Sequence, residues 1–206
     1  MPALRSDIVT LGAEAWLSTG RSVSINAFAR RATGVASSDP RPGRLYNRPA
    51  YVVGSNNARG VELSVRQVSG RVTGSASYTL SRSEMDAVGM KYHASADRPH
   101  VFNTTVMVRA TSALRAGAAF TAASGVPFTL TIATVEDCAR SQTCDANQLP
   151  WVDAANDSRA PTYASLDLLA DWSARFRGLD IGAYAQLRNA LGRDNATIYT
   201  GEENAC

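Results

Sequence analysis

The chain has 206 residues, which is enough for one large all-β unit or two small domains. Its apolar content of 45% argues against a disordered chain. The formal net charge is +3 with scattered basic residues, so the chain has no footprint for binding nucleic acid.

Alternation with a period of two dominates the sequence and predicts strands. The clearest example is residues 72–81, where Val72, Ala76, Tyr78 and Leu80 share a face with Gly74 while the other face carries only Ser and Thr. A helix would mix these two sets, whereas a strand separates them. The same separation predicts eight strands, in chain order at 9–17, 23–30, 61–66, 72–81, 102–110, 114–122, 165–175 and 180–188. Their lengths are near the roughly 9–11 residues with which a tilted strand crosses a bilayer.

Short and long connections alternate along these strands. The short ones are Gly20-Arg21, Ser69-Gly70, Ser112-Ala113 and Arg177-Gly178, and the long ones span about 34–59, 85–99 and 125–160. Bacterial outer-membrane barrels have short periplasmic turns and longer extracellular loops. The pattern therefore predicts an all-β fold, an antiparallel transmembrane β-barrel, with about eight strands of a larger barrel in this chain.

The two predicted strand faces differ in composition. The apolar face holds many Ala residues and some Gly, which fill a protein core poorly but are compatible with lipid. The other face would point into the lumen, and its charged candidates are Glu62, Arg66, Asp167, Asp171, Arg175 and Arg188. We interpret them either as a lumen site for a plug or a charged solute, or as a solvated wall with cross-strand ion pairs.

The longest predicted loop contains Cys138 and Cys144, which an oxidising compartment would allow to form a disulfide; two unpaired thiols are the alternative. The only histidines, His93 and His100, are expected near the extracellular rim. No triad spacing and no metal-binding spacing is present, so we expect no enzyme activity, no cofactor and no metal site.

Several segments resemble those of one family. They are GVELS at 60–64 followed by 74–81, RPHVFN at 98–103, SGVPF at 124–128, YASLDL at 163–168 and RNALGRDN at 188–195. Their order and spacing resemble the barrel of TonB-dependent outer-membrane receptors. The resemblance implies a barrel of about 22 strands with a plugged lumen. It also implies an N-terminal plug domain, through which a TonB-type periplasmic partner powers transport.

The sequence lacks a signal-peptide pattern, a plug domain and a closing strand with a terminal aromatic. We therefore expect residues 1–206 to be a C-terminal portion of the receptor barrel in the outer membrane. Its expected partners are outer-membrane lipid, the TonB-type coupler and a small nutrient ligand.

The expected function is energy-coupled uptake of a scarce nutrient: a metal chelate, cobalamin or an oligosaccharide. One alternative is a passive porin or a structural barrel. A second is a soluble secreted β-domain used for adhesion.

Overall fold

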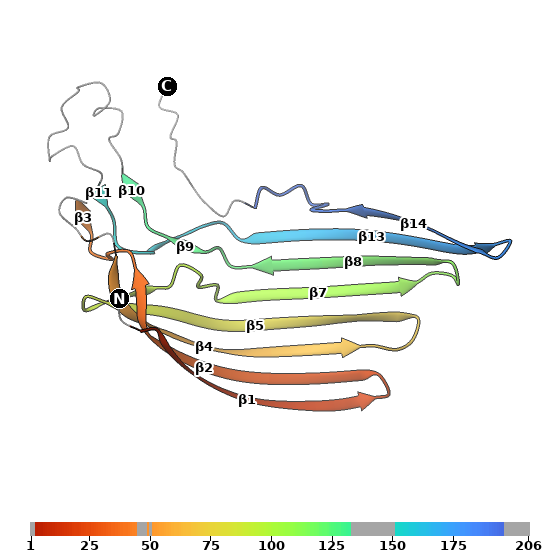
Figure 1. The fold of residues 1–206 in the computed structure, drawn as a ribbon, viewed down its shortest axis with the longest axis horizontal. Helices are drawn as coiled ribbons and strands as arrows, with labels where there is room; N and C mark the ends of the chain where they lie inside the picture. Colours follow the sequence, from red (N-terminus) through yellow and green to blue (C-terminus); the bar gives the residue numbers. More distant parts are fainter. Residues whose placement is uncertain (1–2, 45–48, 50, 133–150, 196–206) are drawn as a thin grey trace, which may run out of the picture.

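The computed structural model describes residues 3–44, 49, 51–132 and 151–195. The fold in these ranges is an all-β antiparallel sheet, shown in Figure 1. Within them, no helix is long and apolar enough to cross a membrane. The eight long strands are β1 (Arg5–Ser18), β2 (Arg21–Ser37), β4 (Val52–Gln67), β5 (Val72–Ala87), β7 (His100–Arg109), β8 (Leu114–Ala123), β13 (Tyr163–Phe176) and β14 (Leu179–Leu187). Each pairs with the next in this order, and β6 (Met90–His93) pairs with β5 as a ninth strand.

The four tight turns that the sequence predicts lie at one end of the sheet, and the three predicted long connections lie at the other (Figure 1). Glycines with positive φ are found in three of these turns, at Gly20, Gly70 and Gly178. In the turn from β13 to β14, Arg177 and Gly178 have φ of 49° and 83°. Two successive positive φ values match the right-handed twist of the flanking strands, which keeps such a hairpin tight.

The strand register joins the predicted apolar faces into one surface. Directly opposed residues of an antiparallel pair lie on the same side of the sheet. One such row runs across seven strands through Ala13, Ile25, Leu63, Tyr78, Phe102, Ala122 and Ala164. The next row toward the turns contains Ala15, Val23, Val65, Ala76, Thr104, Phe120 and Leu166. The predicted assignment of residues to faces is confirmed.

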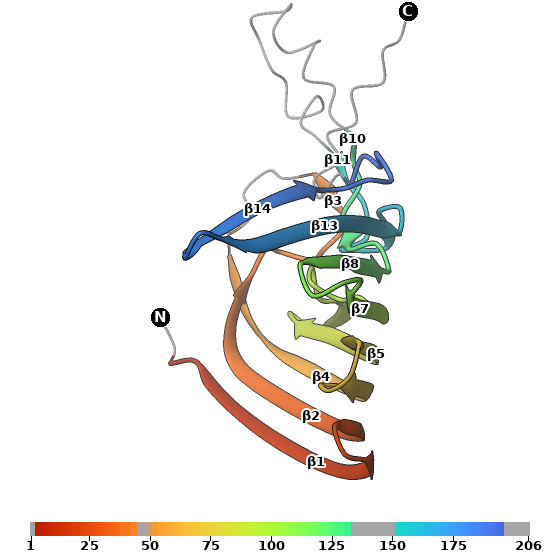
Figure 2. The same ribbon diagram turned by 90° about the vertical axis from the view of Figure 1, so that its right-hand side faces the viewer.

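The sheet is curved but not closed. Figure 2 shows the strands following an arc from β1 to β14. These two strands are the edges, and they do not pair with each other. The polar face is less exposed than the apolar face on β4, where Glu62 and Ser64 are half-buried and Val61 and Leu63 are exposed. Side chains crowd on the inside of a curved sheet, so we assign the polar face to the concave side.

Little of the described chain forms an apolar core. The buried apolar residues are few and mostly Ala, and they are Ala32, Val52, Met85, Ala87, Ala94, Ala123, Ala160 and Ala164. The largest fully buried side chains are those of Asp97 and Pro40. A soluble domain of this size normally buries well over half of the surface its unfolded chain exposes, mainly with large apolar side chains inside. The apolar surface of this sheet is instead left open.

The strands extend further toward the long loops than the sequence predicts. Residues 52–59 were predicted as loop but form the first half of β4, and β2 and β5 extend to Ser37 and Ala87. These extensions carry polar residues on both faces, so they show no alternation. They are strands because β4 pairs there with β2 on one side and β5 on the other.

Candidate functional site at the polar face and the loop rim

The predicted lumen residues of β4 lie on the polar face. Glu62 is paired with Asn26 and Thr79, and the Thr79 hydroxyl donates to its Oε2 at 3.2 Å. On the same face of β4, Arg66 lies two rows closer to the tight turns than Glu62, opposite Ser22 and Ser75. It borders an open hollow of about 450 Å³ together with Glu14 and small polar side chains. No ion pair of Arg66 or Glu14 is present among the described residues.

The predicted lumen residues of β13 are held by cross-strand contacts. Asp171 lies opposite Arg115, whose Nε and Nη2 donate to its Oδ1 at 3.0 and 2.7 Å. Arg175 lies opposite Asp180, with Nε 2.9 Å from Oδ1. The Arg175–Asp180 pair is largely exposed, and in the other pair Arg115 is exposed while Asp171 is half-buried, so each contributes little to stability. This arrangement fits the interpretation as a solvated wall with ion pairs.

Asp167 has a different role from the other carboxylates on this strand. It is half-buried, and its Oδ1 accepts from the backbone N–H of Asn189 at 2.9 Å and from the Ser165 hydroxyl at 3.3 Å. It therefore anchors the segment that follows β14. Arg188, the residue after the end of β14, is exposed and shows no side-chain partner among the described residues.

The three long loops meet at the other end of the sheet, which we call the loop rim. Short strands connect the first loop to the third: β3 (Gly43–Arg44) pairs with β11 (Trp151–Val152), which also pairs with β10 (Thr131–Ile132). Within the third loop, β9 (Pro127–Phe128) pairs with β12 (Ser158–Arg159). Figure 1 shows β3, β10 and β11 side by side at this end of the sheet.

A buried ion pair joins the second and third loops. The Asp97 side chain is 1% exposed, and its Oδ2 lies 2.5 Å from Nη2 of Arg159 and 3.2 Å from Nδ1 of His93. Its Oδ1 accepts from the backbone N–H of Ser83 at 2.6 Å. Arg159 also donates from Nη1 to the carbonyls of Asp97 and Gly125. We refer to Asp97, Arg159 and His93 as the rim ion cluster.

Asn156 provides a second link between the same loops. Its Nδ2 donates to the carbonyl of His93 at 2.6 Å, and its backbone N–H and Oδ1 both contact the Thr129 hydroxyl. The residue is buried and has a φ of 54°, a conformation that Asn tolerates better than most residues. Between the first and second loops, the hydroxyls of Ser37 and Tyr92 lie 2.7 Å apart.

The rim ion cluster is suited to holding loops rather than to chemistry. Both carboxylate oxygens of Asp97 already have partners, and the group is shielded from solvent, so it is not available as a base or a ligand. Among the described residues, no group of three or more His, Cys, Asp and Glu side chains is arranged to hold a metal ion. The side chains of His93 and Arg159 remain partly exposed to solvent.

Several predicted features lie elsewhere or were missed. His93 and His100 are both at the loop end of the sheet. Cys138 and Cys144 lie outside the described residues, so their pairing stays a prediction. Sequence reasoning did not identify Asp97 and Arg159, since 62 residues separate them and neither belongs to an alternating segment.

We found no match to this chain among family models, curated proteins or solved structures.

Proposed function

We propose that this chain is a portion of an outer-membrane β-barrel of the TonB-dependent receptor type, which takes up a scarce nutrient. In this proposal the apolar face contacts lipid, the polar face lines the lumen and the loop rim meets the nutrient. Energy would come from a TonB-type periplasmic partner acting through a plug domain. The nutrient would be a metal chelate, cobalamin or an oligosaccharide, as the sequence resemblance implies.

The observation that carries the proposal is the continuous, uncovered apolar face. Leu11, Ile25, Leu63 and Leu80 come from four successive paired strands and are 48–77% exposed. A soluble protein rarely exposes a contiguous apolar patch of more than a few hundred Å². Lipid would cover this face without requiring a complementary protein surface.

The height of the apolar face supports the same conclusion. On β5 the face runs from Val72 to Leu80 and ends at the charged Arg82. Nine residues at about 3.3 Å each span about 30 Å along the strand, or about 23 Å vertically at a tilt of about 40°. The apolar band of an outer-membrane barrel is about 25 Å tall.

The open edges also fit a part of a larger barrel. Among the described residues, the backbone groups of β1 and β14 lack a neighbouring strand on one side, and lipid does not tolerate unpaired backbone groups. Pairing with further strands would close the sheet. The joined loops support a receptor role, because a rim that holds its loops in place can present fixed side chains to a ligand.

Site-directed spin labelling of the full-length gene product in lipid vesicles tests the membrane placement. With Cys138, Cys144 and Cys206 replaced by Ser, single cysteines would be introduced at Ala76 and at its neighbour Ser75. We expect the label at Ala76 to collide mainly with oxygen, which partitions into lipid, and the label at Ser75 to collide mainly with a water-soluble nickel chelate. Equal accessibility at both positions would overturn the membrane assignment.

A transport assay separates active from passive uptake. Cells expressing the full-length product would be offered radiolabelled cobalamin, a ferric hydroxamate chelate and a maltodextrin, with and without a protonophore. We expect concentrative uptake of one substrate and its loss when the proton gradient is removed. Uptake that continues unchanged with the protonophore would favour the passive porin and contradict the energy-coupled receptor.

A further inference from the structure

The polar face of β1, β2 and β4 contains a hollow toward the tight turns, which we call the polar-face hollow. Its volume is about 450 Å³, within the range of roughly 300–1,000 Å³ for small-molecule sites. Directly opposed residues share a side of the sheet, so three successive rows place their side chains here. These rows contain Trp16, Ser22 and Arg66, then Glu14, Ser24 and Ser64, then Gly12, Asn26 and Glu62.

Small residues make room for this hollow and give it a floor of hydrogen-bonding groups. The hydroxyls of Ser24 and Ser64, on β2 and β4, lie 2.7 Å apart. A Cβ at Gly12 would overlap Oδ1 of Asn26, so any other residue there would push the Asn26 amide aside. Hydroxyl and amide groups both donate and accept, so this floor suits a ligand with many hydroxyl groups.

Two opposite charges line the hollow from its two sides. Glu14 is on β1 and Arg66 is on β4, with β2 between them, so their backbones are about 10 Å apart at about 4.8 Å per strand. Both side chains are exposed, and neither has an ion pair or a side-chain hydrogen bond among the described residues. The adjoining Glu62 already accepts from the Thr79 hydroxyl. A carboxylate that accepts and a guanidinium that donates are therefore available to one ligand.

An exposed aromatic ring adjoins the hollow at its turn end. Trp16 is 66% exposed and lies directly opposite Ser22, which in turn lies opposite Arg66. The C–H groups of a sugar ring make its faces apolar enough to pack on an indole, whereas the hydroxyl groups around its edge need donors and acceptors. Trp16 and the polar-face hollow together provide both kinds of contact.

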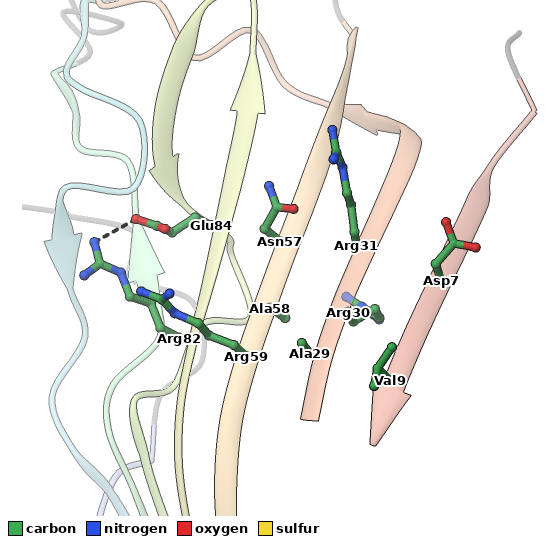
Figure 3. A pocket seen from close by; sticks show the side chains of 10 residues that line it. All are labelled: Asp7, Val9, Ala29, Arg30, Arg31, Asn57, Ala58, Arg59, Arg82 and Glu84. Carbon is green, nitrogen blue, oxygen red and sulfur yellow. Dashed lines mark hydrogen bonds and ion pairs between the residues drawn. The ribbon is translucent and has the colours of Figure 1, made fainter. Parts of the chain in front are cut away.

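A second hollow, of about 410 Å³, lies toward the loops and lacks this combination. Figure 3 shows the side chains that line it, among them the apolar Val9 and Ala29. Arg82 and Glu84 pair with each other there at 2.7 Å. No residue that lines it has an aromatic ring or a hydroxyl group. The combination of a ring, hydroxyls and two unpaired charges thus belongs to the polar-face hollow.

We propose that the polar-face hollow binds one sugar unit of a neutral oligosaccharide that passes along the lumen wall. Trp16 stacks on one face of the sugar ring, while Glu14 and Arg66 bind hydroxyl groups at its two sides. The ligand is neutral because Glu14 would repel an anion and Arg66 would repel a cation. The inference rests on the proposed function and selects one of its three nutrient classes.

A glycan array tests the proposal with the full-length product in nanodiscs, which leave both ends of a barrel open to solvent. The array would carry neutral oligosaccharides together with sialylated and sulfated ones. We expect binding to a subset of the neutral glycans. Titration calorimetry with the glycan bound best should show at least about tenfold weaker affinity for Trp16→Leu and for the double variant Glu14→Gln, Arg66→Gln. Trp16→Phe, which keeps a ring, should bind more tightly than Trp16→Leu.

Each variant has a matched control on the same face of the sheet. Tyr184→Leu removes another exposed aromatic ring, and the double variant Arg175→Gln, Asp180→Asn removes another carboxylate and guanidinium. None of these three residues lines the polar-face hollow. Both controls should therefore bind the glycan like the parent.

Absence of binding to every neutral glycan would overturn the inference, and so would binding to acidic glycans alone. Equal affinity of the Trp16→Leu variant and the parent would place the glycan elsewhere and have the same consequence. The spin label at Ala76 distinguishes the two proposals. A label in lipid without glycan binding rejects this inference alone, whereas a label in water rejects both, since the polar face would then line no lumen.

Discussion

At the scale of single residues, the ion cluster at the loop rim is the most constrained feature of the molecule. Asp97 is buried and accepts from Arg159 and from the backbone of Ser83, and it lies beside His93. Removing one partner of a buried ion pair leaves the other charge without compensation, and this cost exceeds the worth of an exposed pair. The pair also connects two loops that follow different strands, so its loss should affect their relative position.

We expect Asp97→Asn to lower the free energy of unfolding by about 2–3 kcal/mol, somewhat less than for a fully buried pair because Arg159 remains partly exposed. Asp180→Asn breaks the exposed pair with Arg175 and should cost less than about 1 kcal/mol. Urea unfolding of the full-length product in lipid vesicles, followed by Trp fluorescence, measures both values. Similar losses in the two variants would argue against a structural role of Asp97.

At the scale of elements, the hairpin between β5 and β6 has an unfavourable turn residue. Val88 and Gly89 form the turn, with φ of 48° and 77°. A β-branched residue with positive φ is strained, since its Cβ crowds the backbone. The sequence analysis predicted a long loop over 85–99 and missed this hairpin. A Val-Gly pair is not a recognised hairpin signal, whereas Asn-Gly is. Pairing of β6 with β5 holds the turn in place.

Replacing Val88 by Asn should raise the unfolding free energy by about 1 kcal/mol, because Asn accepts positive φ and suits this turn. The same change at Val53, a similarly exposed residue within β4, should lower it by up to about 1 kcal/mol, since Asn is a poor strand former. The shift in the urea midpoint checks both signs. A loss of stability in Val88→Asn would show that the side chain of Val88 has a favourable contact outweighing the strain.

At the scale of the whole molecule, the sheet has one face that no part of the described chain covers. The few buried apolar residues lie outside this face or at its margin near the loops, so they do not make it a core. Stability would then depend on the medium that contacts the apolar face and on the strands that pair with β1 and β14. This dependence predicts that the same substitution will change the stability differently on the two faces of the sheet.

Arginine placed on the apolar face should destabilise the assembled full-length barrel, whereas arginine on the polar face should be tolerated. Ala76→Arg and Ala183→Arg should each cost roughly 2–4 kcal/mol near the bilayer midplane. Ser75→Arg and Gln186→Arg, on the same two strands, point to the other side of the sheet and should cost much less. Folding into lipid vesicles at increasing urea concentration gives the four values, and equal tolerance would contradict the membrane-facing assignment.

The sequence by itself determined three features: the half of each strand that lies toward the tight turns, the face on which each of its residues lies, and the positions of these turns. These features follow from local rules: residues two apart share a face, and a reversal needs only a few residues with suitable φ. Glu62, Arg66, Asp167, Asp171 and Arg175 could be assigned to the polar face for this reason. Their partners were less predictable, because pairing of Asp171 with Arg115 depends on which strands are neighbours and in what register.

Only the tertiary structure decided the remaining features. Residues 52–59 become a strand through neighbours on both sides, and Asp97 meets Arg159 because two loops fold together at one rim. Arg59 lies directly opposite Arg82 because β4 and β5 align in this register. Contacts between segments far apart in the chain leave no periodic pattern in the sequence, and the register that creates them is fixed only when the whole sheet assembles.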